Sequence, residues 1–186
     1  TGITTDGLIT LGLTPLASST VIAPVAPGEV VVVTGGARGV TADVALAMAK
    51  AWKPTLVLLG RTDAPVAEAE WLAPLRGETE IQQALLKRAN GAIRPKELRE
   101  ATDAVLRNRA ALNNIAAMNA AGATVHYHAV DIRDAKEVSS LFDHIRAEHG
   151  PVCGIVHGAG VLADRLIADK TVEQFQQVYG TKVDGI

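Results

Sequence analysis

The chain has 186 residues and a formal net charge of −2, with 18 lysines and arginines against 20 acids. This length suits one domain, with or without an arm, and the charge balance gives no electrostatic basis for a nucleic-acid partner or an anionic membrane. No apolar run of about 18 residues is present for membrane insertion. The single cysteine excludes an internal disulfide, and we expect a cytoplasmic protein.

Four short apolar runs alternate with helical patterns along the chain. Valines fill positions 30–33, and a run that is apolar on both faces is typical of a buried parallel strand. The next helix carries Val40, Val44 and Met48 on one stripe, which we expect to be buried. This order predicts an α/β fold, a Rossmann-type doubly wound parallel sheet, with strands at 30–33, 55–59, 124–130 and 152–157 and helices at 39–52, 135–148 and 172–184.

Three segments depart from this simple alternation. Residues 1–28 are rich in Thr, Ser, Gly and Pro, and we interpret them as a linker or N-terminal arm with a short edge strand at 8–13. The connection after the second strand is too long for a plain crossover, and its balanced charges predict a surface insertion of helices at about 62–110. The chain starts at Thr1 without a methionine, and its last residues, 182–186, look like the middle of a sequence, so we interpret it as a piece of a longer polypeptide.

The first strand ends in the glycine turn Thr34-Gly35-Gly36-Ala37-Arg38-Gly39. Glycines between a strand and a helix let the backbone approach a pyrophosphate, which the helix N-terminus then attracts. Turns also use glycine for backbone reasons alone, but the strand–turn–helix context favours a dinucleotide site.

The choice of cofactor depends on the residue after the second strand. A site for NAD usually has Asp or Glu there, whereas this chain has Arg61, and Arg38 lies within the glycine turn. Two guanidinium groups suit a 2′-phosphate, so NADPH is favoured over NADH. The alternative is that Arg61 is simply solvated.

Polar and small residues also end the third and fourth strands. Asp131 is placed to accept a hydrogen bond from an adenine amino group, while Asp134 is a plausible helix N-cap. His157-Gly158-Ala159-Gly160 let the backbone pass beside a flat ring, although a lone histidine is more often structural. His126 and His128 lack an evident third metal ligand, so no metal site is expected. Cys153 is expected in the core.

The last helix begins with a Thr171–Gln174 capping box, and Lys182 continues the apolar stripe Val172, Phe175 and Tyr179. A lysine on a stripe that should be buried either reaches outward or serves chemistry.

Together these motifs resemble the short-chain dehydrogenase/reductases, and within them the ketoreductase domains of polyketide synthases and polyunsaturated fatty acid synthases. The matching pieces are the glycine turn, Arg61, Asp131, the segment 157–161 and the segment 181–185, in that order. The long insertion is most similar to the polyunsaturated fatty acid synthase branch.

The resemblance implies NADPH-dependent reduction of a β-ketoacyl thioester on an acyl carrier protein, with other domains of the same synthase as partners. It implies that Lys182 is catalytic and that the serine and tyrosine acting with it lie beyond Ile186. We therefore expect 29–186 to be an incomplete domain, truncated on its C-terminal side, which does not catalyse alone. Asp164 resembles the last residue of the Leu-Asp-Asp motif of B-type ketoreductases, which suggests a role in stereochemistry. The expected cofactor-binding residues are Thr34, Gly35, Gly36, Arg38, Gly39, Val40, Arg61, Asp131, Ile132, His157, Gly158, Ala159 and Gly160.

Two other functions stay open at this point. One is a free-standing short-chain dehydrogenase acting on a small alcohol or ketone, and the other is a non-catalytic nucleotide-binding module.

Overall fold

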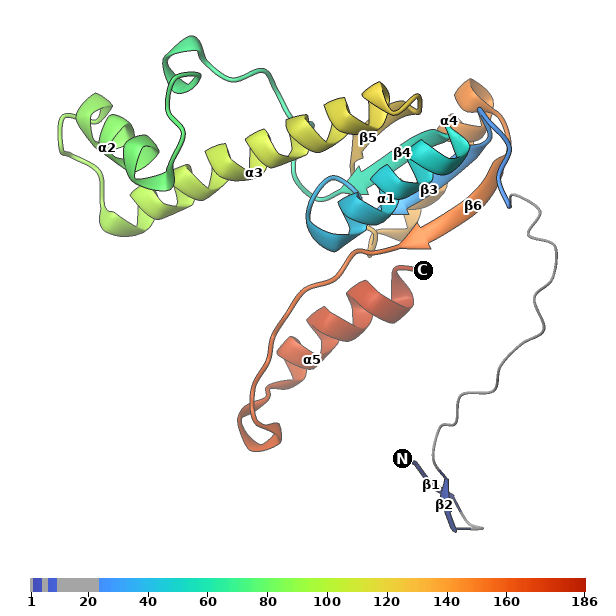
Figure 1. The fold of residues 1–186 in the computed structure, drawn as a ribbon. Coiled ribbons are helices and arrows are strands. Elements are labelled where there is room, and N and C mark those ends of the chain that lie inside the picture. Colours follow the sequence, from blue (N-terminus) through green and yellow to red (C-terminus); the bar gives the residue numbers. More distant parts are fainter. Residues whose placement is uncertain (1, 5–6, 10–23) are drawn as a thin grey trace.

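The computed structural model describes residues 2–4, 7–9 and 24–186. Its centre is a parallel sheet with the strand order β5-β4-β3-β6 (Figure 1). The strands match the predicted ones to within one residue at each end, and they are β3 (Val30–Thr34), β4 (Thr55–Gly60), β5 (Thr124–Ala129) and β6 (Val152–His157). The order places the first strand at the centre, as in a Rossmann fold.

Helices cover both faces of this sheet, which explains why its central strands are apolar on both sides. Alternate residues of β3 and β4 pack against α1 (Gly39–Trp52) and α3 (Pro95–Ala120) on one face. The other residues of these strands pack against α4 (Ala135–His149) on the opposite face. The predicted doubly wound α/β architecture is therefore confirmed.

The buried stripe predicted for α1 is wrong in part. Val40 and Val44 are 80% and 42% exposed, whereas Ala42, Ala45 and Met48 are buried. The close approach of α1 to the sheet and to α3 selects small side chains, so the alanines rather than the valines face the core. An assignment by side-chain size therefore misplaces the stripe by about a third of a turn.

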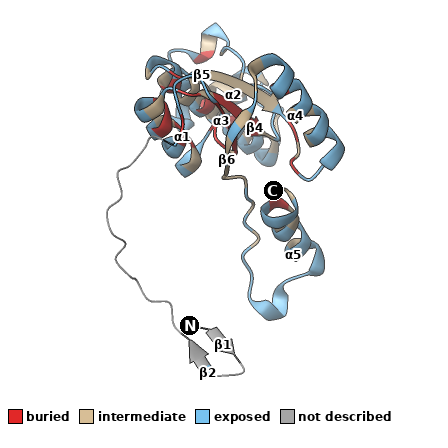
Figure 2. Ribbon diagram, turned by 90° about the vertical axis from the view of Figure 1, so that its right-hand side faces the viewer, coloured by how far each residue is buried: buried red, intermediate tan, exposed pale blue. Residues whose placement is uncertain are grey.

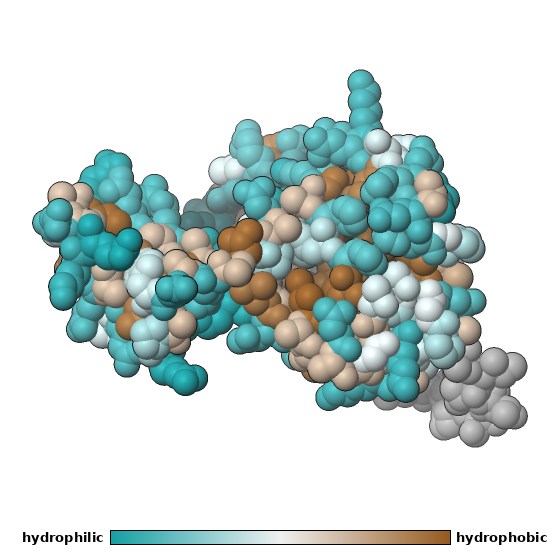
Figure 3. All heavy atoms as spheres, turned by 90° about the horizontal axis from the view of Figure 1, so that it is seen from above, coloured by the Kyte–Doolittle hydropathy of each residue, from teal (hydrophilic) through white to brown (hydrophobic). Residues whose placement is uncertain are grey.

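The insertion contains a short 3-10 turn (Glu70–Leu72), α2 (Glu78–Arg88) and the start of the long helix α3, which runs from Pro95 to Ala120 and so continues past 110. Its surface is largely hydrophilic (Figure 3). Arg109 of α3 holds the preceding loop through paired hydrogen bonds of 2.7 and 2.8 Å to the Glu68 carboxylate. The same guanidinium donates to the carbonyl oxygens of Leu72 and Leu75, so this loop is fixed along α3.

The segment after β6 extends away from the sheet and carries a 3-10 turn (Ile167–Asp169), α5 (Val172–Tyr179) and a π-helical turn (Gly180–Asp184). Figure 2 shows α5 lying beside the sheet's layers with a mainly exposed surface. The capping box of Thr171 and Gln174 is confirmed, but Val172, Phe175 and Tyr179 are 66%, 54% and 45% exposed. The predicted stripe exists but is not buried.

Cys153 is exposed, so its expected place in the core is wrong. Its strand β6 pairs only with β3 among the described residues and alternates between exposed and half-buried positions. An apolar strand sequence does not reveal that one of its faces lacks a helix.

Near the N-terminus, β1 (Gly2–Thr4) pairs antiparallel with β2 (Gly7–Ile9). The predicted edge strand at 8–13 therefore joins β1 over its first two residues instead of the parallel sheet, and residues 10–13 lie outside the described residues. Among the helices that the structure describes, none has the length and apolar character needed to cross a membrane.

Candidate functional site

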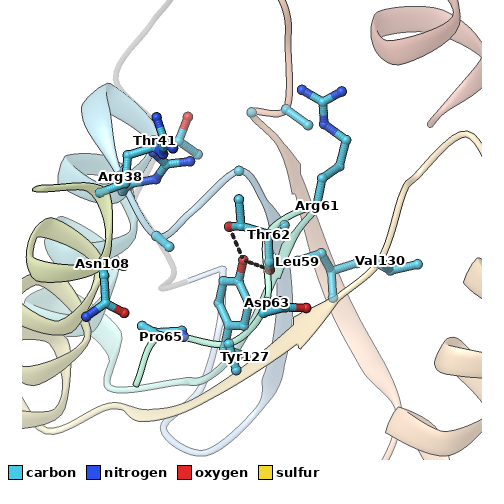
Figure 4. Close-up of a pocket in the computed structure, with 18 of the residues that line it drawn as sticks. Arg38, Thr41, Leu59, Arg61, Thr62, Asp63, Pro65, Asn108, Tyr127 and Val130 are labelled. Atoms are coloured by element: carbon cyan, nitrogen blue, oxygen red, sulfur yellow. Dashed lines mark hydrogen bonds between the residues drawn. The ribbon is translucent and has the colours of Figure 1, made fainter. Parts of the chain in front are cut away.

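A cleft of about 800 Å³ lies at the carboxyl ends of the parallel strands (Figure 4). Ligands bind at this edge in open α/β sheets. The predicted residues that line it are Gly35, Arg38, Arg61, Ile132, Gly158, Ala159 and Gly160. The predicted residues that do not line it are Thr34, Gly36, Gly39, Val40, Asp131, His157, Asp164 and Lys182.

The glycine turn after β3 has a backbone conformation that depends on glycine at two positions. Gly35 and Gly39 have φ angles of +72° and +63°, in the region that favours glycine. A Cβ atom on Gly35 would lie 3.1 Å from the backbone of Ala159, so the turn packs directly against the segment after β6. No side chain caps the start of α1 at Gly39, which leaves its first N–H groups open to an anion.

A hydrogen-bonded chain ties the ends of β3 and β6 together behind the cleft. Nε2 of His157 lies 3.0 Å from the carbonyl oxygen of Thr181, which can only accept, so Nε2 carries the hydrogen. In the neutral ring Nδ1 then accepts from the Thr34 hydroxyl at 3.1 Å, and that oxygen accepts from the Ala159 N–H at 3.1 Å. His157 and Thr34 therefore position the backbone that lines the cleft.

Two close contacts explain glycines in the segment after β6. A Cβ atom on Gly158 would lie 2.2 Å from Cγ2 of Thr41, so the Thr41 side chain occupies that space. A Cβ atom on Gly160 would lie 3.0 Å from Nζ of Lys182. The Lys182 side chain therefore lies over Gly160, at the edge of the cleft, although the residue is exposed. The π-helical turn at 180–184 holds it in this position.

Asp131 is held by its neighbour Arg133. The guanidinium of Arg133 donates to both carboxylate oxygens at 2.5 to 3.2 Å. These hydrogen bonds, assisted by the charges of Arg133 and Arg61, lower the pKa of Asp131 to about 2. The carboxylate is ionised and engaged at neutral pH, while its neighbours Val130 and Ile132 line the cleft. Asp134 caps α4 by accepting from the N–H groups of Lys136 and Glu137, which confirms that alternative.

Sequence reasoning missed a whole wall of the cleft. The loop 62–66 and Tyr127 line it, together with Ala104, Arg107, Asn108 and Ala111 of α3. The Tyr127 hydroxyl donates to the carbonyl oxygen of Thr62 at 2.8 Å, and a Cβ atom on Gly60 would lie 2.4 Å from that hydroxyl. The α3 residues recur at the helical spacing of three and four, but that spacing alone does not show which part of the fold this helix face meets.

The charged residues that line the cleft are Arg38, Arg61, Arg107 and Asp63, a net charge of +2. Arg38 and Asn108 lie on one side in Figure 4, and Arg61 lies on the other. A cleft of this size, with open helix N–H groups and a positive balance, fits an anionic dinucleotide.

The family model of the KR domain matches residues 29–186. The chain belongs to the ketoreductase domain family. Members of this family and of the short-chain dehydrogenase/reductases use a nicotinamide cofactor, which agrees with the glycine turn and with the position of the cleft.

Ketoreductase relatives come from large synthases. The chain is 34% identical over 168 residues to one component of the polyunsaturated fatty acid synthase of Thraustochytrium sp., covering 85% of this chain and 6% of that protein. It is 47% identical over 68 residues to a polyketide synthase–nonribosomal peptide synthetase of Aspergillus flavipes, covering 37% of this chain and 2% of that protein. The chain therefore spans only a small part of the relatives it matches, and these relatives are multidomain synthases.

Solved ketoreductases share the fold. A ketoreductase domain from the bacillaene assembly line has a TM-score of 0.60 at 26% identity and covers 91% of this chain, which spans 30% of that one. An N-terminal ketoreductase from the macrolactin assembly line has a TM-score of 0.61 at 24% identity, with coverages of 91% and 26%. Within the described part of this ketoreductase, no group of three or more His, Cys, Asp or Glu side chains is arranged to hold a metal ion.

Proposed function

We propose that this chain is the cofactor-binding portion of an NADPH-dependent ketoreductase. The reaction is the reduction of a β-ketoacyl thioester, carried on an acyl carrier protein, to the β-hydroxyacyl form within a multienzyme synthase. The observation that carries the choice of NADPH is the pair Arg38 and Arg61 on the cleft lining, with an arginine where a site for NAD usually has an acid directly after the second strand.

Each part of the cleft has a role in this proposal. The turn from Gly35 to Gly39 and the start of α1 bind the pyrophosphate through backbone N–H groups. Arg38 and Arg61 bind the 2′-phosphate, and the strand end at Asp131 and Ile132 borders the adenine. The segment from Gly158 to Gly160 packs against the ribose on the nicotinamide side.

Bound NADPH supplies the hydride for the ketone carbon. Lys182, over Gly160, assists the tyrosine that protonates the ketone oxygen. The two tyrosines of the chain, Tyr127 and Tyr179, both precede Lys182, and neither does so by the four positions of the usual Tyr-x-x-x-Lys pair of short-chain dehydrogenases. In the ketoreductases that this chain resembles, the tyrosine follows the lysine motif. We therefore propose that the tyrosine and serine of the catalytic set come from outside these 186 residues, and that Asp164 contributes to B-type stereochemistry.

Titration with NADPH and NADH tests the cofactor assignment. We expect the chain to bind NADPH more tightly than NADH, and the substitutions Arg61→Ala and Arg38→Ala to remove most of that preference because each deletes a charged hydrogen-bond donor. Arg165→Ala is the matched control, since Arg165 is exposed and lies outside the cleft. Equal affinity of the unaltered chain for NADPH and NADH would falsify the assignment.

The catalytic part needs a separate assay. We expect the 186-residue chain to bind NADPH without oxidising it when a β-ketoacyl thioester is added. The same assay on a chain extended through the catalytic serine and tyrosine should show oxidation that Lys182→Ala abolishes. Turnover by the 186-residue chain alone contradicts the proposed division of roles.

A further inference from the structure

Helix α3 of the insertion presents one face to the cofactor cleft. Ala104, Arg107, Asn108 and Ala111 line the cleft at intervals of three and four residues, so they form a single stripe along the helix. The insertion is therefore part of the wall of the site and not only a surface addition.

Two asparagines of α3 fix this wall to the cleft. Nδ2 of Asn114 donates to the carbonyl oxygen of Ala37, inside the glycine turn, at 2.9 Å. The side-chain amide of Asn108 bonds both backbone groups of Val66, accepting from its N–H at 2.9 Å and donating to its carbonyl oxygen at 2.8 Å. The glycine turn and the loop after β4, which carry Arg38 and Arg61, are thus attached to the same helix.

Arg107 is the only charged side chain on the α3 stripe, and no group of the described residues pairs with its guanidinium. Among residues 2–4, 7–9 and 24–186, no hydrogen bond or ion pair involves its guanidinium, whereas Arg94 and Arg109 on the same insertion are paired with Glu97 and Glu68. Its neighbours on the stripe, Ala104 and Ala111, are small and leave the space beside it open.

The placement of Arg107 relative to Arg38 follows from these contacts. Ala111 lies one turn after Arg107 on the stripe and belongs to the same buried hydrophobic cluster as Ala37, the residue that precedes Arg38. The four residues from Arg107 to Ala111 rise about 6 Å along the helix, a distance that an extended arginine side chain can span. Asn108, beside Arg107 in the sequence, lies on the same side of the cleft as Arg38 in Figure 4.

We propose that Arg107 is a specificity-determining residue that joins Arg38 in binding the 2′-phosphate of NADPH. This inference rests on the proposed use of NADPH. A third guanidinium adds charge-assisted hydrogen bonds to a phosphate group that NADH lacks, so its contribution is to the choice of cofactor. Asp63, on the same lining, opposes an anion, and the charge of Arg107 offsets that of Asp63.

The substitution Arg107→Ala tests the proposal in the full chain. Loss of one charged phosphate contact at an accessible site weakens binding by about tenfold, so we expect the dissociation constant for NADPH to rise about that much while the constant for NADH stays unchanged. Arg107→Lys should keep part of the NADPH affinity, because it keeps the charge but loses the planar fork. Arg99→Ala is the matched control, since Arg99 lies on α3, is exposed and does not line the cleft.

The possible results separate this inference from the proposed function. If the unaltered chain prefers NADPH and Arg107→Ala leaves both affinities unchanged, or weakens both equally, the role of Arg107 is overturned while the use of NADPH stands. If the unaltered chain has no preference for NADPH, both the proposed use of NADPH and the proposed role of Arg107 are overturned. Circular dichroism of each variant, compared with that of Arg99→Ala, establishes that the fold is retained.

Discussion

Gly158 lines the cleft at a position where the Thr41 side chain leaves no room for a larger residue. Its α-carbon faces Thr41 so closely that the substitution Gly158→Ala would place a Cβ atom 2.2 Å from Cγ2 of Thr41. Overpacking of this kind costs about 1–3 kcal/mol, and displacement of Thr41 would also disturb the start of α1. We expect a lower melting temperature and weaker binding of NADPH, measured by thermal unfolding and by titration.

Two further variants control this expectation. Thr41→Gly combined with Gly158→Ala should recover most of the lost stability, because it removes the atoms that clash. Gly154→Ala, on strand β6 just before that segment, should be nearly neutral, since its Cβ atom would lie 3.7 Å from Val31. A double variant no more stable than Gly158→Ala alone would contradict the contact as the cause.

The residue scale also shows the limits of sequence reasoning about the site. The glycine turn, Arg61 and the segment 158–160 could be placed at the cleft because each follows a recognisable strand, and strand ends converge in a parallel sheet. Arg107 and Asn114 could not, because their role depends on where a long insertion returns to the sheet. Asn114 bonds the carbonyl oxygen of a residue 77 positions earlier, and nothing local in the sequence records that contact.

At the scale of elements, the half-buried pair of Arg109 and Glu68 holds the insertion together. Their side chains are 22% and 17% exposed, and Arg109 also satisfies two backbone carbonyl groups. We expect Arg109→Ala to lower the free energy of unfolding by about 2 kcal/mol, because a half-buried carboxylate loses its partner. Lys96→Ala breaks an exposed pair with Glu100 and should cost less than about 0.5 kcal/mol. Equal effects of the two substitutions in denaturant unfolding would overturn this assignment.

Strand β5 and helix α4 meet through four histidines, a pairing that predicts sensitivity to acid. His126 stacks on His149 with ring centroids 4.1 Å apart, and His128 meets the edge of His144 at 6.0 Å. Burial first, and then the neighbouring histidines, lower the pKa values of His126 and His128. Glu148, which lies 2.9 Å from His144, is the acid among these groups and acts in the opposite direction.

The sign of the pH effect follows from those lowered pKa values. The unfolded chain binds protons at the ordinary histidine pKa of about 6.5, before the folded chain does, so stability is complete above that pH and falls as the pH drops below it. We expect the melting temperature to fall between pH 6.5 and 5, and His128→Leu to flatten the fall. His144→Gln should flatten it less, because burial outweighs the neighbouring charge at His128. An unchanged slope in His128→Leu contradicts this origin.

Helices and strands could be predicted from the sequence where a short run of neighbouring residues specifies them. The valine run of β3 and the capping residues Asp134 and Thr171 specify their strand and helices through nearby atoms alone. The burial of each face was harder to predict. Cys153 and Phe175 look like core residues in the sequence, and only the arrangement of the layers shows that no described helix covers them.

At the scale of the whole molecule, the chain has a packed part and an extended part. The two hydrophobic clusters join the parallel sheet to α1, α3 and α4, and neither includes a residue beyond Val156. The segment 161–171 carries exposed Leu162, Leu166 and Ile167 without a regular strand or helix longer than one turn. Such a segment opens at little cost in free energy.

We therefore expect limited trypsin digestion to cut first after Arg165 and Lys170, both exposed within that segment. Mass spectrometry should find a fragment that ends there well before any cut inside α3, whose Arg109 is held by the loop beside it. Early cleavage within α3 would show that the insertion is less firmly attached than its contacts indicate.

The exposed thiol of Cys153 makes this chain suitable for labelling at a single site. It is the chain's single cysteine and lies four residues before His157 on the same strand, about 13 Å along β6 from the edge where the cleft opens. A fluorophore or spin label attached there would be singly placed, rigidly mounted and remote from the glycine turn. Cofactor binding can then be followed spectroscopically, with no cysteine to remove and none to introduce.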